Sequence, residues 1–246
     1  MPTDRDLAAT LAPTGVLRAG INLSNFLLVS SRADNGDPVG VAPDMARAVA
    51  DRIGVRLQYV PYPKPSDLAD AAGADAWDIG LIGAEPARAE VIDFTPAYCE
   101  IQSTYLVPAG SPLHAIADVD RPGIRIAVAA RTAYGLWLDR NIQHAELVHA
   151  DGLDASFDLF VRDKLDALAG LRPKLLGEAD RVPGARILDG QFAAVQQAIG
   201  VPRGRDPAAA AFLRTFVADA IASGLVARLI DQHGVHGLSV APGAAA

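Results

Sequence analysis

The feature that most constrains the fold of this 246-residue chain is a strand and helix pattern that occurs twice. The first half of the chain contains the strand-like runs Leu17-Arg18-Ala19-Gly20-Ile21 and Trp77-Asp78-Ile79-Gly80-Leu81. The second half contains two similar runs, Ile124-Arg125-Ile126-Ala127-Val128 and Leu165-Asp166-Ala167-Leu168-Ala169. In each half a helical pattern separates the two runs. Because strands that alternate with helices form parallel sheets, the sequence predicts two similar α/β lobes.

A ligand-binding edge is predicted at the end of the run Ile79 to Ile82. This run is apolar and short, and Gly80 and Gly83 would weaken a helix there, so we expect a buried strand. Glu85-Pro86 then indicates a short helical turn, because proline is tolerated at the first helical position. The turn places Arg88 beside the carboxyl end of the strand, which is the edge where open α/β sheets bind ligands.

The residues around Arg88 resemble the signature of a known family. Pro86-Ala87-Arg88, Val91-Ile92-Asp93-Phe94-Thr95 and Pro96-Ala97-Tyr98 are similar to the Thr-Pro-Glu-Arg … Val-Asp-Phe-Ser-x-Pro-Tyr pattern of the family 3 extracellular solute-binding proteins. These are two-lobed receptors that hand amino acids and similar small polar solutes to bacterial ABC importers. The resemblance extends from Leu17 to His233 and supports the fold by analogy.

The resemblance implies an α/β fold with two doubly wound lobes joined by two hinge strands, like the type II periplasmic binding proteins. The hinge strands would be Ser103 to Pro108 and the return through Phe192 to Ile199. Residues 1–106 and 196–246 would form the first lobe, and residues 107–195 the second. A small carboxylate-bearing solute, amino-acid-like or an organic acid, would bind in the cleft between the lobes, with Arg88 holding its carboxylate.

Polar turns at strand ends supply further candidates. Asn22, Ser24 and Asn25 follow the strand-like run Val16 to Leu23, and they are either cleft residues or ordinary turn residues. The family usually has an aromatic residue near Asn25 that covers the ligand, and we interpret this sequence as lacking one. The ligand-binding candidates of the first lobe are Arg88, Asn22, Asn25, Leu81 and Gly83.

The second lobe has a candidate anion site at a predicted helix start. Thr132 is the expected N-cap, and the free amides after it, beginning at Ala133, would attract a carboxylate. A role of Thr132 in capping its own helix is compatible with this site. Arg131 replaces the glycine of the family's Gly-Thr-Thr turn and points either into the cleft or to solvent.

One departure from the family bears on the ligand. In amino-acid receptors of this family an aspartate near the position of Leu171 meets the ligand's ammonium, and a hydroxyl residue near that of Gly83 assists it. A buried ammonium without such partners loses hydrogen bonds worth about 1.5–3 kcal/mol each. We therefore expect an ordinary α-amino acid not to be favoured unless Glu100 or Glu85 replaces the missing acid. Further candidates for ligand contacts, beside the second hinge, are Gln196 and Gln197.

Two helix starts are predicted from capping residues. Asp44 is expected to begin a helix that Gly54 closes, because apolar residues recur between them at helical spacing. Asp206-Pro207 is a strong start for a later helix with one apolar face. Both helices are expected to pack on the core of the first lobe.

The bulk composition excludes several classes of protein. Half of the residues are hydrophobic, which is enough for a large core, while a net charge of −7 without a basic run argues against a nucleic-acid partner. Cys99 is the single cysteine, so no intrachain disulfide forms. No stretch approaches the roughly 20 apolar residues of a membrane span. We expect a monomer without a cofactor.

The amino terminus does not fit the family's location. Met1 to Gly15 lacks the basic start and apolar core of a secretory signal peptide. The resemblance implies a periplasmic protein. Either a leader has been removed or the protein stays in the cytoplasm, and the residues leave both open.

Two further functions are compatible with the same scaffold. Dehydratases resembling cyclohexadienyl dehydratase share the fold and use an acidic residue in the cleft, for which Glu100 or Glu85 would need burial near the ligand and a raised pKa. A cytoplasmic sensor would use ligand-driven closure to signal to a partner. The five histidines are scattered, and only His233 and His236 are close in sequence, so we expect no metal site.

Overall fold

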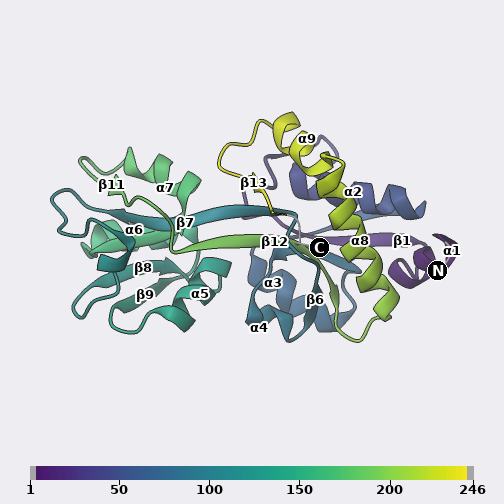
Figure 1. The fold of residues 1–246 in the computed structure, drawn as a ribbon, viewed down its shortest axis with the longest axis horizontal. Helices are drawn as coiled ribbons and strands as arrows, with labels where there is room; N and C mark the ends of the chain where they lie inside the picture. Colours follow the sequence, from purple (N-terminus) through teal and green to yellow (C-terminus); the bar gives the residue numbers. More distant parts are fainter. Residues whose placement is uncertain (1–3, 243–246) are drawn as a thin grey trace. The chain divides into compact units, whose positions relative to one another are not determined.

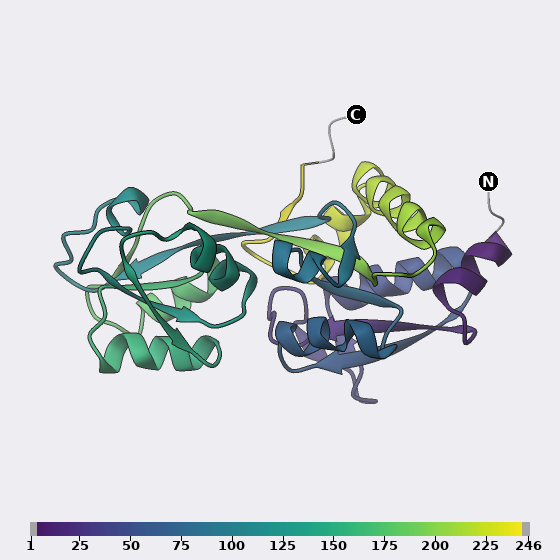
Figure 2. The ribbon, with the colours of Figure 1, turned by 90° about the horizontal axis from the view of Figure 1, so that it is seen from below.

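The computed structural model describes residues 4–242, which form two compact α/β units. The first unit comprises the described chain up to Glu100 and from Gln196 onward, and the second comprises Ile101–Val195. The chain passes between them within β7 (Cys99–Val107) and within β12 (Ala193–Pro202), as Figures 1 and 2 show. Sequence analysis placed these passages at residues 106–107 and 195–196, in the same two strands.

The sheet of the first unit has the strand order β4-β1-β5-β12, with β6 added to β12. β1 pairs in parallel with β4 and β5, whereas β12 runs antiparallel to β5 and β6. A short β13 pairs with the start of β7. The strands of this unit are β1 (Val16–Asn22), β4 (Arg56–Tyr62), β5 (Ile79–Gly83), β6 (Ile92–Phe94), β13 (Ser239–Val240) and the separate hairpin of β2 (Ser31–Arg32) and β3 (Pro38–Val39).

The buried strand β5 lies at the centre of this sheet, as its apolar sequence predicts. All five of its residues are buried. Trp77 and Leu68 press directly on Gly20 and Gly80, where a Cβ atom would lie 3.0–3.3 Å from their side chains. These two glycines therefore allow the close packing of Trp77 against the sheet.

Seven helices belong to the described part of the first unit. They are α1 (Asp4–Leu11), α2 (Val41–Ile53), α3 (Pro65–Asp70), the 3₁₀ turn η1 (Ala71–Ala74), α4 (Pro86–Ala89), α8 (Pro207–Ala222) and α9 (Leu225–Gln232). Asp206 caps α8 by accepting a bond from the amide of Ala208, which confirms the predicted helix start. Among the described residues no single helix is long and apolar enough to cross a membrane, and α8 with α9 reaches that length only as a pair bent by 67°.

The prediction that α2 begins at Asp44 is wrong. The helix begins at Val41, with Gly40 as the N-cap, so Pro43 and Asp44 both lie in the first turn. Proline fits there because the first amides of a helix have no intrahelical partner. Instead, Asp44 Oδ2 forms a hydrogen bond with His233 Nε2 at 2.7 Å, which links α2 to the end of α9.

The sheet of the second unit has the order β7-β10-β8-β9, with β11 added to β7. β8 is parallel to β9 and β10, and β7 is antiparallel to β10 and β11. The elements are β8 (Arg125–Ala129), β9 (Glu146–Ala150), β10 (Ala167–Leu171), β11 (Arg186–Ile187), η2 (Ile116–Asp118), α5 (Ala133–Asn141), α6 (Leu153–Arg162) and α7 (Arg172–Ala179).

Helices cover both faces of this second sheet. Phe157 and Phe160 of α6 and Leu175 of α7 pack with Leu106 and Leu168 of the sheet. On the other face Tyr105 stacks on Phe192, which in turn contacts Trp137 of α5. Since residues 105 and 106 are neighbours on one strand, they point to opposite faces. The second unit is therefore doubly wound.

The repeated sequence pattern corresponds to a repeated structural contact. Asp78 accepts a bond from the amide of Arg18 and donates its own amide to the Arg18 carbonyl. Asp166 and Arg125 exchange the same two bonds in the second unit. In both units the aspartate before the inner strand is thus fixed to the arginine of the neighbouring strand.

Candidate functional site

The carboxyl ends of three parallel strands meet at one edge of the first unit. Asn22 and Tyr62 end β1 and β4 and are paired in register, and Gly83 ends β5. The loop after β1 and the short α4 follow directly at this edge. This is the position at which open α/β sheets bind ligands.

Arg88 lies on α4, one turn beyond this edge. Glu85 and Pro86 begin that helix as the sequence predicts, with Glu85 at the N-cap and Pro86 at the first position. The Arg88 side chain is buried, with 5% of its surface exposed, and its Nη1 donates to the carbonyl oxygen of Gly83 at 2.7 Å. A guanidinium has five donors in a fixed fork, and this bond orients the fork against the end of β5.

The asparagines of the loop after β1 form local turns. Asn22 Oδ1 accepts bonds from the amide and hydroxyl of Ser24, at 3.2 and 2.8 Å. Asn25 Oδ1 accepts from the amide of Leu27 at 3.3 Å. These bonds are ordinary turn chemistry, and they fix the loop at the strand edge. Ligand contacts by Asn22 and Asn25 stay a prediction.

Sequence analysis missed an aromatic residue in this loop, and the interpretation that none lies near Asn25 is wrong. Phe26 follows Asn25 directly and is 40% exposed. Its position in a polar turn after a strand was visible in the sequence. Tyr62 is a second aromatic residue at the edge, and burial raises the pKa of its hydroxyl, partly opposed by Arg18.

The remaining candidates of the first unit lie on or beside β12. Leu81 is fully buried between β1 and β12, so its side chain belongs to the core. Gln197 pairs with Gly83 in register and is also buried. Glu100 is half-buried and accepts a bond from Gln196 Nε2 at 2.8 Å. The structure therefore brings Gly83, Arg88 and Gln197 together at the end of β5.

The second unit presents a capped helix at the carboxyl edge of β8. Thr132 Oγ1 accepts from the amide of Gly135 at 3.0 Å and donates to the carbonyl of Ala129 at 2.8 Å, which confirms the predicted N-cap. Ala133 is the first residue of α5. Arg131 precedes the cap with a φ of 57°, a left-handed conformation that non-glycine residues rarely adopt.

At the end of β10, Leu171 occupies the position near which the amino-acid receptors have an aspartate. Leu171 is buried at this end, opposite Ser103 of β7. The next residue, Arg172, donates to the carbonyls of Leu188 and Gly190 and, through Nε, to Gln102 Oε1 at 3.1 Å. Arg172 thus braces the segment before β12.

A buried acid lies close to this edge, inside the second unit. Glu178 of α7 lines a small cavity with Tyr134, Ser156, Gly170 and Lys174. Its Oε1 forms a long ion pair with Lys174 Nζ at 3.4 Å and has no hydrogen-bond partner within residues 4–242, while Lys174 also pairs with Asp154 at 2.9 Å. Burial raises the pKa of Glu178, although the Lys174 ammonium opposes that shift.

Within residues 4–242 no cluster of three or more His, Cys, Asp or Glu side chains has the arrangement of a metal site. His233 of the pair considered from sequence is engaged by Asp44 instead. The groups described at the two strand edges include the Arg88 guanidinium, the exposed Phe26 ring and the first amides of α5.

The model of one protein family, described as bacterial extracellular solute-binding proteins, family 3, matches residues 17–236. This chain belongs to that family. A search of curated protein sequences finds no significant match. The family assignment agrees with the two-unit α/β fold and with the resemblance carried by the residues around Arg88.

Solved structures of several kinds share the fold of this family 3 protein. A substrate-binding protein of an amino acid ABC transporter, AbpA from Streptococcus pneumoniae bound to L-arginine, has a TM-score of 0.70 at 16% identity, covering 92% of this chain and 98% of that one. The ancestral amino-acid-binding protein AncCDT-1, a precursor of cyclohexadienyl dehydratase, has 0.71 at 19%, covering 90% and 96%. A histidine kinase sensor domain has 0.73 at 17%, covering 92% and 98%. At these identities the likeness concerns the fold.

Proposed function

We propose that this family 3 protein binds a small carboxylate-bearing solute, and that it serves as the substrate-binding component of an ABC importer outside the cytoplasm. The observation that supports this most is Arg88, a buried guanidinium held by the Gly83 carbonyl at the carboxyl end of β5. A forked guanidinium pairs with a carboxylate through two parallel bonds. No covalent chemistry is required.

Other groups at the strand edges are candidates for further contacts. Phe26 offers an exposed aromatic face in the loop after β1. In the second unit, the first amides of α5 after Thr132 offer donors together with the positive end of a helix dipole. We propose that both contact the solute, in addition to Asn22, Asn25 and Gln197.

The class of solute depends on whether the protein has an acidic residue that could pair with the ammonium group of an amino-acid ligand. Leu171 is apolar, Glu100 is bonded to Gln196, and Glu85 is the N-cap residue of α4, so we propose that none of the three replaces the aspartate of the amino-acid receptors. We propose that organic acids bind better than the matching α-amino acids. L-glutamate and glutarate differ only in the ammonium, and we expect glutarate-like acids to bind at least about tenfold more tightly than their amino-acid counterparts.

A thermal-shift screen of carboxylates, amino acids and prephenate-like compounds tests the proposal. A specific ligand at 100 times its dissociation constant stabilises the folded protein by about 2.7 kcal/mol, which raises the melting temperature by about 5–10 °C for a chain of this size. Arg88→Ala should abolish the shift. Arg214→Ala, which removes an exposed arginine paired with Asp93, is the matched control and should keep it. An unchanged shift in Arg88→Ala would show that another group holds the carboxylate.

The same screen separates the binding protein from a dehydratase. A dehydratase would consume the prephenate-like compound and release product, which mass spectrometry of the screened samples detects. The partly exposed Glu100 is bonded to a neutral amide, and this gives little support for a catalytic acid. If product forms and Glu100→Gln abolishes its formation, the protein is a dehydratase and the binding-protein proposal is wrong.

A further inference from the structure

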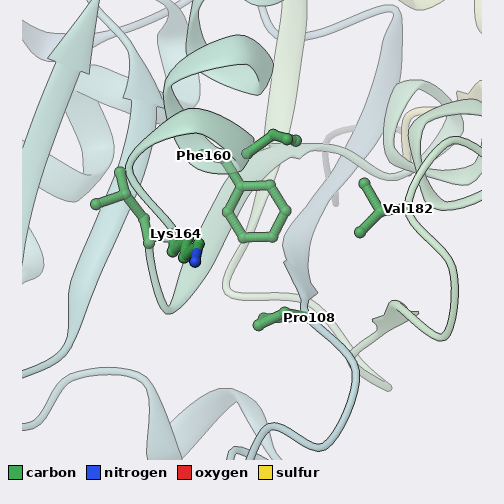
Figure 3. A pocket seen from close by; sticks show the side chains of 6 residues that line it. Pro108, Phe160, Lys164 and Val182 are labelled. Carbon is green, nitrogen blue, oxygen red and sulfur yellow. The ribbon is translucent and has the colours of Figure 1, made fainter.

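The second unit has an open apolar groove that the proposed function does not use. The groove has a volume of about 250 Å³ and is lined by Pro108, Phe160, Val161, Lys164, Leu165 and Val182. Figure 3 shows the Phe160 ring between Lys164 and Val182, with Pro108 below it. Lys164 and Leu165 precede β10, whereas Leu171 ends that strand, so the groove lies at the edge opposite the candidate ligand-binding edge.

The end of α6 builds the floor and the rim of the groove. The amide of Leu165 donates to the carbonyl of Phe160 at 3.0 Å, the bond that closes a helix in the Schellman motif. That motif brings the buried side chains of Phe160 and Leu165 together. Between them Lys164 occupies the left-handed position with a φ of 48°, where glycine or asparagine is usual. A lysine kept in this conformation points to a use for its side chain.

The charge at the rim is positive. Asp163 is paired with Arg162 at 2.6 Å, and Asp166 with Arg125 at 3.7 Å. The Lys164 ammonium has no acidic partner among the residues that the structure describes. Its own carbonyl accepts a bond from Arg125 Nη2 at 2.9 Å, which keeps a second cation near the rim.

We propose that this groove binds a small amphipathic carboxylate, with its apolar body against Phe160, Leu165 and Val182 and its carboxylate at Lys164. The volume is slightly below the range of about 300–1,000 Å³ typical of pockets for drug-sized ligands, so the occupant is a single aromatic ring or a short alkyl chain with one acidic group. An apolar wall with one placed cation matches that chemistry. The proposal is independent of Arg88 and of the solute proposed for the strand edges.

The test is a titration of the full chain with 3-phenylpropanoate, followed by NMR of the backbone amides. We expect saturable shifts at residues 160–165 and at Val182, with a dissociation constant of about 1 mM or below. The neutral analogue 3-phenylpropan-1-ol should bind at least about tenfold more weakly, because it lacks the charge-assisted bond to Lys164. Arg88 and Thr132 belong to the carboxylate site proposed above, so shifts of their amides report that site and are evaluated separately from those of the groove.

Two variants examine the cation and the groove separately. Lys164→Gly should keep or raise the melting temperature, since glycine adopts positive φ without strain, while its affinity for 3-phenylpropanoate falls about tenfold to that of the alcohol. Val161→Glu places an acid on an exposed helical position, 47% exposed, and should abolish binding by repulsion. Lys64→Ser removes the same charge in the first unit and should leave binding unchanged.

Three results would overturn the proposal. Shifts that do not saturate, or that appear at Arg88 and Thr132 instead of the groove, would show that the groove is not the site. Equal affinity for the acid and the alcohol, or an unchanged affinity in Lys164→Gly, would show that Lys164 does not recognise a carboxylate.

Discussion

The two units contain the same arginine and aspartate pair in very different surroundings. In the first unit the Asp78 side chain has no exposed surface and receives Arg18 through Nε at 3.1 Å and Nη2 at 2.7 Å. Arg205 adds a third contact at 3.2 Å. In the second unit Asp166 is 38% exposed and lies 3.7 Å from Arg125 Nε.

The difference shows that a repeated sequence motif determines which residues bond to each other but does not determine how much those bonds stabilise the fold. Both aspartates connect the start of an inner strand to the neighbouring strand through the same two bonds. The carboxylate accepts from the amide of the arginine, and the aspartate amide donates to the arginine carbonyl. Only Asp78 is also enclosed, because Arg205 reaches it from the turn before α8. A buried carboxylate depends on its cations, whereas an exposed one is largely compensated by water.

The largest effect is expected at Asp78. Asp78→Ala should lower the free energy of unfolding by about 3–5 kcal/mol, because it leaves Arg18 and Arg205 with one weak partner, the exposed Asp75. Urea denaturation measures the loss, and amide hydrogen exchange should locate it in the first unit. A loss below about 1 kcal/mol would mean that burial does not distinguish the two pairs.

A gain in stability is expected in the second unit at Glu178. Its raised pKa means that the folded protein binds this proton more tightly than the unfolded chain does, so the stability contribution is full at acidic pH and is lost as pH rises through the raised pKa. Glu178→Gln should therefore stabilise the protein by about 1 kcal/mol at pH 7 and have little effect at pH 4. Denaturation curves at the two pH values measure this. A destabilised variant at pH 7 would show that Lys174 outweighs the cost of burial.

An effect of similar size is expected at the helix start of the second unit. Thr132→Ala removes the side-chain cap on the amide of Gly135 and should cost about 1 kcal/mol. Asp206→Ala, which removes the corresponding cap of α8 in the first unit, is the matched comparison. Thermal denaturation of both variants measures the two caps, and a Thr132 variant as stable as the parent would show that this cap contributes nothing measurable to stability.

The smallest effect is expected at Asp166. Asp166→Ala should cost less than about 1 kcal/mol, since its ion pair with Arg125 is long and exposed. Urea denaturation beside Asp78→Ala gives the comparison directly. If the two variants lost equal stability, the backbone bonds common to both motifs, rather than the enclosed guanidinium groups, would carry the energy.

Local patterns predicted much of the fold. The apolar run with flanking glycines marked β5, Pro86 and Pro207 marked the starts of α4 and α8, and Thr132 marked the cap of α5. Each of these features depends on residues within one turn or one strand, so a short segment of sequence is enough to predict it. The start of α2 was misplaced because glycine, proline and aspartate each fit a helix start. Gly40 lies so close to Leu28 that a Cβ atom there would overlap the Leu28 carbonyl oxygen, a tertiary contact that the sequence does not reveal.

For the candidate site, too, some features could be predicted from the sequence and others could not. The position of Arg88 at the end of a strand followed from sequence, but its bond to the Gly83 carbonyl and its burial did not. In the sequence Phe26 stands between the polar pair Ser24-Asn25 and the apolar run Leu27-Leu28-Val29, and only its exposure made it a candidate. Glu178 had no sequence signal, because the residues that surround it come from α5, α6 and β10 as well as from its own helix α7.

By itself, the sequence determined the alternation of strands and helices, the caps of α5 and α8 and the doubling of the arginine and aspartate pair, since these depend on spacing along the chain. The tertiary structure alone decided which of the two pairs is enclosed, because Arg205 meets Asp78 across 127 residues. Burial sets the strength of a charge contact through the water it excludes, and no short segment of sequence specifies which distant segment will cover it.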